Sequence, residues 1–246
     1  MALQIAYLYD GSFSGFLCCV YASYYEKEMP IAINDYAATQ QMLFKVRHIK
    51  TCPDKACRVE NSIAQKISSE ALELLRLCFL SSEEGKELAM LNFLRMGYNE
   101  GGKVVDMLAD NNVQAVMRRV KAVQSEAHLF KGFLRFSDFG GALAAVFEPK
   151  NFVLPIIAAH FCDRLPGEEF LIYDQSHNYV FIHKMGEKKL FPVEHFEMPK
   201  PCEEEIAYRK MWKRFYETIA IKGRINPKLA AGNMPLRYRA HMTEFL

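Results

Sequence analysis

The sequence predicts an α+β fold, because strand-like and helix-like hydrophobic patterns both occur along its 246 residues. Short apolar runs rich in aromatic and β-branched residues, such as residues 3–9 and 170–174, are typical of β-strands. Residues 63–128 instead place apolar side chains every three or four positions, which is typical of amphipathic helices. Half of the residues are hydrophobic, so the chain can bury a sizeable core and is not intrinsically disordered.

The N-terminal strand, residues 3–9, leads into a turn at Asp10-Gly11-Ser12. Apolar residues then recur at helical spacing from Phe13 to Tyr24, so we expect a strand–helix unit. Either Asp10 or Ser12 could accept hydrogen bonds from the first free N–H groups of this helix. Asp10 is also a candidate functional residue, because functional groups often lie at the carboxyl ends of strands in α/β folds.

Turn and capping signals divide the helical middle of the chain. Ser81 and Glu84 have the spacing of a capping box, which predicts the start of a helix. Gly97 and the pair Gly101-Gly102 predict helix ends. An apolar run at helical spacing follows Asn111-Asn112 and predicts a further helix.

The second half has the order β-β-α-β-β, followed by a long C-terminal helix. We expect strands at residues 129–136, 142–147, 170–174 and 179–183, a helix at 151–164, a linker at 192–201 and the long helix at 203–220. The acidic first turn of the long helix suits the positive end of its macrodipole. We expect a single domain, residues 1–246, with possible subregions 1–128 and 129–246.

Several familiar cofactor motifs are missing from the sequence. It has neither a Gly-x-Gly-x-x-Gly fingerprint nor a phosphate-binding loop ending in Lys-Ser or Lys-Thr. Cys52 and Cys57 lack the spacing of a zinc knuckle, as do the adjacent Cys18 and Cys19. We therefore expect no bound metal and no cofactor.

The seven cysteines and the absence of an export signal predict free thiols in a reducing cytoplasm. No apolar run approaches the roughly 18 residues of a membrane helix, so we expect a cytoplasmic protein without a membrane partner. The net charge is only +2, so a surface that attracts nucleic acid has to be local.

The segment from Arg209 to Arg239 is the one place where positive charge is concentrated. Lysine and arginine release counterions when they neutralise phosphates, and exposed aromatic rings can stack on bases. The candidate nucleic-acid-binding residues are therefore Arg209, Lys213, Lys222, Arg224, Lys228, Arg237 and Tyr238. An apolar stripe through Trp212 on the long helix is more simply interpreted as a core face, with the charges solvated on the other side.

A second set of polar residues could carry chemistry. His160 lies on the apolar face of its predicted helix, Arg164 follows one turn later, and Asp174 ends a strand that is expected to pack nearby. Arg135 is expected to project from a neighbouring strand. His160 is interpreted either as a core histidine or as part of a constellation that grips a phosphate or serves as acid and base.

Four blocks of the chain resemble a known family. The first is Tyr9-Asp10-Gly11-Ser12-Phe13-x-Gly15-Phe16, and the second contains Ile49-Lys50-Thr51 and Arg58. The central block contains Phe133-x-Arg135-Phe136, His160-Phe161-x-x-Arg164 and Ile172-x-Asp174; the last runs from Trp212 to Tyr238. These blocks resemble a bacterial family of probable DNA metabolism proteins of unknown activity, and Arg58 becomes a further candidate residue.

The resemblance implies a pathway but no reaction. Members of that family resemble a segment found fused ahead of a uracil-DNA-glycosylase-like domain, and they are linked to a radical-SAM protein thought to act on DNA. The expected partners are therefore DNA, a radical-SAM protein and a uracil-DNA-glycosylase-like protein. The sequence departs from the family pattern at Cys52, where an acidic residue is expected, and at Arg239, where an aromatic residue is expected.

Three hypotheses for the function follow. The leading one is an accessory protein of DNA metabolism and repair that binds nucleic acid and acts with a radical-SAM partner. The second is a hydrolase or nuclease that uses His160, Asp174 and Arg164. The third is a protein-interaction scaffold that does not bind DNA.

Overall fold

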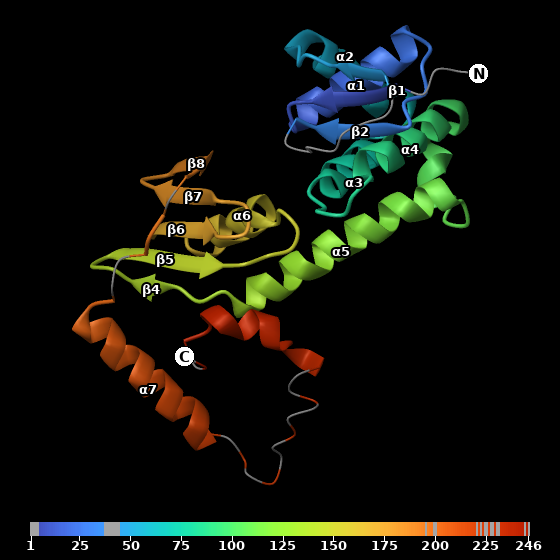
Figure 1. The fold of residues 1–246 in the computed structure, drawn as a ribbon. Helices are drawn as coiled ribbons and strands as arrows, with labels where there is room; N and C mark the ends of the chain where they lie inside the picture. The colour runs from blue at the N-terminus through green and yellow to red at the C-terminus, as the bar shows by residue number, and fades with distance from the viewer. Residues whose placement is uncertain are drawn as a thin grey trace. The chain divides into compact units, whose positions relative to one another are not determined.

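The computed structural model describes residues 5–36, 45–194, 196–198, 201–219, 232–243 and a few single positions between and after the last two ranges. The chain divides into two compact units, residues Met1–Gln124 and Ser125–Leu246, and each is considered by itself. Both combine helices with a β-sheet (Figure 1), so the predicted α+β class is confirmed.

A parallel sheet forms the centre of the first unit. Its described strands, in the order β2-β1-β3, are β2 (Ala32–Asp35), β1 (Ile5–Tyr9) and β3 (Lys45–His48). Ala6 of β1 lies opposite Ala32 on one side and Val46 on the other. Because β1 is covered on both faces, nearly all of its residues are buried, as is typical of central parallel strands.

The first helix begins where the turn after β1 predicts. Ser12 is the N-cap of α1 (Phe13–Tyr25), and its Oγ accepts a hydrogen bond from the Gly15 N–H at 2.9 Å. Asp10 Oδ1 in turn accepts from the N–H and Oγ–H of Ser12, at 3.0 and 2.7 Å. Both predicted capping residues therefore stabilise this turn.

The other described elements of this unit are helices. Besides α1, they are α2 (Pro53–Lys66), α3 (Ser69–Phe79), α4 (Lys86–Glu100), the 3₁₀ helix η1 (Gly101–Asp106) and the first half of α5 (Asn111–Phe133). Of these, α1 and α4 pack directly on the sheet. Two predicted boundaries are wrong. The helix expected at Ser81 begins at Lys86 after Gly85, and Gly97 lies inside α4, where its missing side chain lets Ile67 approach. The stop at Gly101 and the helix after Asn111 are confirmed.

The second unit holds a mixed sheet. Its described strands, in the order β4-β5-β6-β7-β8, are β4 (Ser137–Asp138), β5 (Ala142–Phe147), β6 (Glu169–Asp174), β7 (Tyr179–Lys184) and β8 (Glu187–Pro192). The predicted hairpin β6–β7 is an antiparallel pair. β5 also has an antiparallel partner, but this is β4, which lies after the strand predicted at residues 129–136. Helix α6 (Leu154–Arg164) connects β5 to its parallel neighbour β6 and packs on β6 and β7.

The strand predicted at residues 129–136 is wrong, because α5 continues to Phe133 and only Ser137–Asp138 pair with β5. Phe130 and Leu134 are four residues apart and both buried, so a helix places both side chains on the same side, toward the core. The predicted linker at 192–201 overlaps the end of β8, an exposed strand that the sequence did not reveal.

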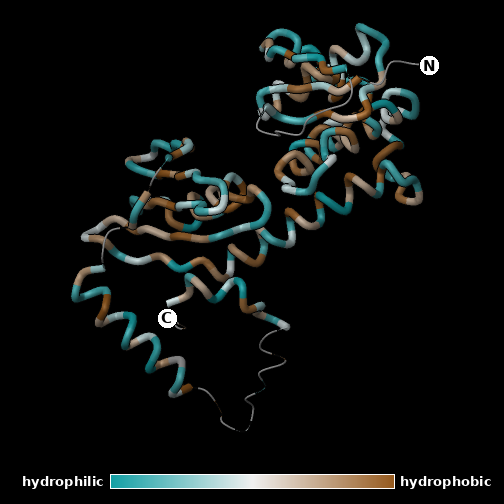
Figure 2. The backbone as a smooth tube through the Cα atoms, in the orientation of Figure 1, coloured by the Kyte–Doolittle hydropathy of each residue, from teal (hydrophilic) through white to brown (hydrophobic). Residues whose placement is uncertain are grey.

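Two C-terminal elements complete this unit, α7 (Glu203–Ile219) and the 3₁₀ helix η3 (Leu236–His241). Hydrophobic and hydrophilic residues alternate along α7 (Figure 2), as in an amphipathic helix. Across the part of the chain that is described, none of the helices combines the length and apolar character that a membrane span requires.

Candidate nucleic-acid interface

Helix α7 is fixed to the sheet by its first two turns. Glu205 is buried, and its Oε2 accepts a hydrogen bond from the Asp138 N–H at 3.2 Å. Arg209, one turn later, donates from Nε to Glu205 Oε1 at 2.8 Å and from Nη2 to Ser137 Oγ at 2.6 Å. These contacts join α7 to β4, so part of the Arg209 guanidinium is used inside the protein.

The rest of α7 presents aromatic side chains to solvent. Tyr208, Trp212 and Phe215 are 67%, 43% and 52% exposed, and Met211 and Ile219 are exposed beside them. The expectation that this stripe forms a core face is therefore wrong. The sequence predicts an apolar stripe correctly, but the periodicity of a stripe does not say whether another element covers it.

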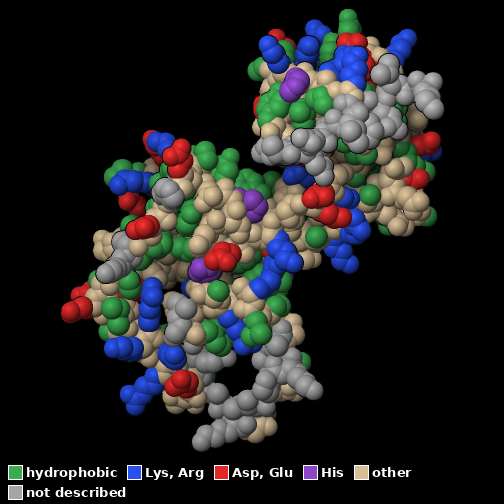
Figure 3. All heavy atoms as spheres, viewed as in Figure 1, with side chains coloured by type: hydrophobic (Ala, Val, Ile, Leu, Met, Phe, Trp, Pro, Cys, Tyr) green, Lys and Arg blue, Asp and Glu red, His purple; other side chains and the backbone are tan. Residues whose placement is uncertain are grey.

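Basic residues lie along the same helix. Lys210, Lys213 and Arg214 are exposed, and Figure 3 shows Lys and Arg side chains along α7 at the lower left. At 3.6 residues per turn, Arg209 and Arg214 fall on opposite sides of the aromatic stripe. We name the set Tyr208, Lys210, Trp212, Lys213, Arg214 and Phe215 the α7 face. Its aromatic rings form one stripe, and its three cations lie about 120° to 160° around the helix from the centre of that stripe.

Two other predicted contacts, Arg237 and Tyr238, are used for internal packing. Tyr238 is only 7% exposed and packs edge-on against Phe130, with ring centroids 4.8 Å apart. Arg237 forms an ion pair with the buried carboxylate of Glu126 and donates to the Tyr238 hydroxyl at 2.8 Å. The Tyr238 ring is therefore not available to stack on a base.

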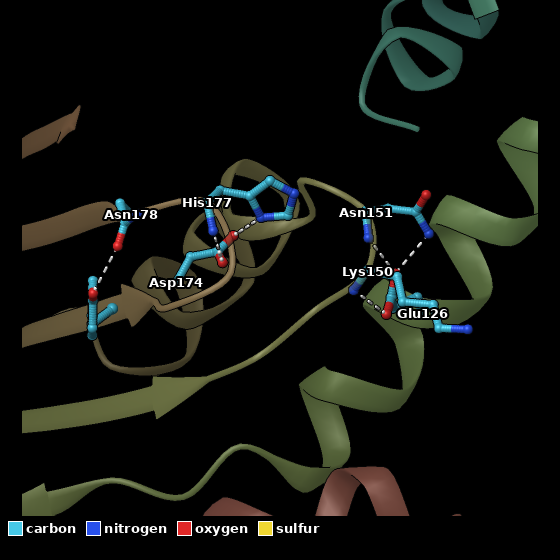
Figure 4. Close-up of polar contacts among 7 residues, drawn as sticks. Glu126, Lys150, Asn151, Asp174, His177 and Asn178 are labelled. Carbon is cyan, nitrogen blue, oxygen red and sulfur yellow. Dashed lines mark hydrogen bonds and ion pairs between the residues drawn. The ribbon is translucent and has the colours of Figure 1, made fainter. Parts of the chain in front are cut away.

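Glu126 also organises the loop after β5 (Figure 4). Its two carboxylate oxygens accept from the backbone N–H groups of Lys150 and Asn151, each at 2.9 Å, and from the Asn151 side chain at 2.6 Å. One buried carboxylate thus joins α5, this loop and η3.

The remaining predicted nucleic-acid contacts, Lys222, Arg224 and Lys228, lie outside the described residues.

The polar residues proposed as catalytic are distributed over the second unit. Asp174, at the end of β6, is fully buried and bonds to His177: its Oδ1 accepts from the His177 N–H at 3.1 Å, and its Oδ2 lies 2.8 Å from His177 Nδ1 (Figure 4). His160 Nε2 is buried without a hydrogen-bond partner, and Arg164 is exposed at the end of α6. The carboxylate therefore pairs with His177 and not with His160 Nε2.

Burial lowers the pKa of His160, and the positive charges of Lys131 and Arg164 lower it further. The lowered pKa favours the neutral imidazole, and the His160 residue as a whole is half-buried. Arg135 follows α5 and is not on a strand; its Nη1 donates to the carbonyls of Gly132 and Leu134, at 3.0 and 3.4 Å. His177 was missed because the pattern Asp-x-x-His was interpreted only as a hairpin turn.

Asp10 lies at the carboxyl edge of the parallel sheet in the first unit. Thr51, after β3, donates to its Oδ2 at 2.6 Å. Partial burial opposes ionisation, but the hydrogen bonds from Thr51 and Ser12 outweigh it and lower the pKa of Asp10. Within the described parts of the chain, no group of three or more His, Cys, Asp or Glu side chains is placed to hold a metal ion.

The family to which the chain belongs follows from a comparison with family models. The model of a domain of unknown function, DUF4130, matches residues 84–244. The chain belongs to this family. The DUF4130 region contains the α7 face, the Glu126 cluster and the Asp174–His177 pair. The parallel sheet with Asp10 and helix α2 with Arg58 precede this region. None of the curated proteins compared with the chain matches it.

Proposed function

We propose that the protein binds single-stranded DNA through the α7 face, as an accessory protein of DNA metabolism. The observation that carries the proposal is the exposure of Tyr208, Trp212 and Phe215 on a helix that also exposes Lys210, Lys213 and Arg214. Proteins that bind single strands without strong sequence preference combine such aromatic platforms with positive charges that follow the backbone.

The geometry of the α7 face suits unpaired bases. The rings of Trp212 and Phe215 are stacked, with centroids 5.6 Å apart and an interplanar angle of 24°, and so offer one continuous platform. From Tyr208 to Phe215 the helix rises about 10 Å, which corresponds to roughly three stacked nucleotides. In a duplex the base faces are covered by their neighbours, so stacking favours single strands.

The resemblance to probable DNA metabolism proteins supports the same proposal and adds its partners. We propose that the bound strand is presented to a radical-SAM protein and, in the same pathway, to a uracil-DNA-glycosylase-like protein. An exposed α7 face suits such a role, because the strand would lie on the surface where a partner can reach it.

The test is a fluorescence-anisotropy titration with labelled single- and double-stranded DNA at low and physiological salt. We expect tighter binding of the single strand. Replacing Lys210, Lys213 and Arg214 by Ala should weaken this binding and reduce the slope of log K against log salt by up to about 2. Replacing Trp212 and Phe215 by Leu should weaken binding but keep the slope.

A matched control removes three exposed lysines from other elements, Lys103, Lys121 and Lys184. This control variant should bind like the wild type. If the wild type does not bind DNA at low salt, or if the α7 and control variants bind equally, the α7 face is not a DNA-binding surface. A scaffold without DNA binding then becomes the better account of the exposed stripe.

The Asp174–His177 pair favours a second candidate function, hydrolysis of nucleic acid. A buried carboxylate that accepts from Nδ1 fixes the imidazole orientation and leaves Nε2 to act as a base. Turnover of a DNA or RNA substrate should then be lost in His177→Ala and kept in His160→Ala. Absence of turnover in the wild type, or its survival in His177→Ala, would remove this candidate.

A further inference from the structure

A tyrosine-lined groove lies in the first unit, between α1 and α2. The two helices pack against each other, and Val20 of α1 and Val59 of α2 are buried at the base of the groove. The groove has a volume of about 570 Å³, within the range of ordinary small-ligand sites. Since it belongs to the first unit alone, it is separate from the α7 face.

The aromatic wall of the groove comes mainly from α1. Tyr24 and Tyr25 lie three and four residues after Tyr21, so both are neighbours of Tyr21 on one side of the helix. Tyr25 is 73% exposed and stacks on Tyr21 with an interplanar angle of 13° and centroids 5.9 Å apart. The outer face of Tyr25 is therefore open to a further flat ring.

Two contacts hold Tyr24, which is 42% exposed. Its ring meets Tyr98 of α4 edge-on at 5.4 Å, and the Arg95 guanidinium lies 5.1 Å from its centroid. Tyr98 donates to Ser62 Oγ at 3.2 Å. Burial raises the pKa of Tyr24 and of Tyr98, so both hydroxyls are neutral at physiological pH and do not repel an anion.

The opposite wall, from α2, is basic. Arg58, Ser62 and Lys66 line the groove at spacings of four residues. Lys55, three residues before Arg58 and outside the lining, continues their row along the helix. The three cations are exposed, and Lys55 Nζ also lies 5.2 Å from the Tyr21 centroid. Among the described residues that line the groove, none is acidic. The row extends for about 16 Å.

We propose that this groove is a second binding site for single-stranded nucleic acid, with a base stacked on Tyr25 and the backbone phosphates on Arg58 and Lys66. Tyrosine rings on one wall of the groove and cations on the other match the flat bases and the negative phosphates of a strand. A purely apolar ligand would leave the cations unused, and a free phosphate would leave the rings unused. The proposal does not depend on the α7 face.

The test uses the full chain in two backgrounds, the wild type and a Trp212→Leu/Phe215→Leu variant. The probe is an octathymidylate in which bromodeoxyuridine replaces thymidine, irradiated in the complex; the crosslinked peptides are identified by mass spectrometry. We expect crosslinks at Tyr21 or Tyr25 in both backgrounds. In the second background, Tyr25→Leu should weaken binding roughly 5- to 150-fold, the range for loss of one stacked base. Arg58→Ala should reduce the salt slope by about 0.7.

Tyr36→Leu and Lys103→Ala are the matched controls, since each removes an exposed side chain of the same kind outside the groove, and both should bind like their background. The proposal is overturned if α1 yields no crosslink and Tyr25→Leu binds like its background. It is also overturned if a Glu-Glu-Tyr-Glu-Glu peptide binds the groove and the oligonucleotide does not displace it. If crosslinks form at α1 and the α7 substitutions do not change DNA affinity, only the proposed function is rejected. If no crosslink forms at α1, Tyr25→Leu binds like its background and the α7 substitutions weaken DNA binding, only this inference is rejected.

Discussion

At the scale of single residues, Gly15 shows how closely the turn after β1 is packed. A β-carbon at this position would lie 2.1 Å from Asp10 Oδ1 and 2.9 Å from Thr51 Oγ1. The carboxylate that caps the turn therefore occupies the space that a side chain would need. Gly15 is thus required by the capping arrangement and not by the backbone conformation.

Gly15→Ala is expected to destabilise the protein by about 1–3 kcal/mol, because overpacking outweighs the helix-forming advantage of alanine. Gly132→Ala in α5, where nothing lies within 4 Å of the added carbon, should be neutral or stabilise by up to about 1 kcal/mol. Urea denaturation measures both. If Asp10 causes the clash, Gly15→Ala should cost less in an Asp10→Ala background; an equal cost would contradict this explanation.

Glu126 is the residue on which the packing of η3 depends. Glu126→Ala should lower the free energy of unfolding by about 2–4 kcal/mol, because the N–H and the side-chain amide of buried Asn151 lose their acceptor and Arg237 loses its ion-pair partner. Glu148→Ala removes an exposed carboxylate whose partner is His241, and should change stability by no more than about 0.5 kcal/mol. Equal effects in chemical denaturation would show that the Glu126 contacts are not stabilising.

The residue-level site was only partly predictable from the sequence. Ser12 and Asp10 were recognisable as caps, because capping depends on local sequence. The partner of Asp174 was not, because a buried aspartate can accept either from a neighbouring turn or from a distant helix. Similarly, Arg237 and Tyr238 form a basic–aromatic pair in the sequence, and only the structure shows that Glu126 and Phe130 contact them.

At the scale of elements, the sequence predicted well those helices and strands that bury one apolar face. The β6–β7 hairpin and α6 follow from clear alternation or helical spacing, with boundaries within a few residues. Strand β8 was missed because all of its residues are exposed, and a charged edge strand has no apolar alternation. Residues 129–133 have the apolar and aromatic composition of a strand, but they form the last part of the long helix α5.

Helix α7 gives an element-scale prediction about stability. Because the Trp212 side chain is 43% exposed, Trp212→Leu should change the free energy of unfolding by less than about 1 kcal/mol. Truncating a buried tryptophan would instead cost about 3–5 kcal/mol. Circular dichroism during urea denaturation distinguishes the two. A large loss would mean that the stripe is covered in the folded protein, and the α7 face would not exist as described.

At the scale of the whole molecule, two surfaces in different units combine exposed aromatic rings with basic side chains, although the net charge is only +2. The positive charge that would attract nucleic acid is therefore local, and salt should screen it strongly. Composition alone predicts neither surface, because the acidic residues elsewhere in the chain compensate the basic ones.

Trp212 is the only tryptophan of the chain, so its fluorescence tests the central claim directly. An unlabelled single-stranded oligonucleotide is added to the wild type at low salt, and the emission is followed as salt is then raised. We predict saturable quenching, because a base stacks on the indole, and recovery of the emission at high salt. The matched duplex should quench less. A parallel anisotropy titration with the same strand carrying a label shows whether the strand is bound. Unchanged Trp212 emission under conditions where the strand is bound would contradict the account.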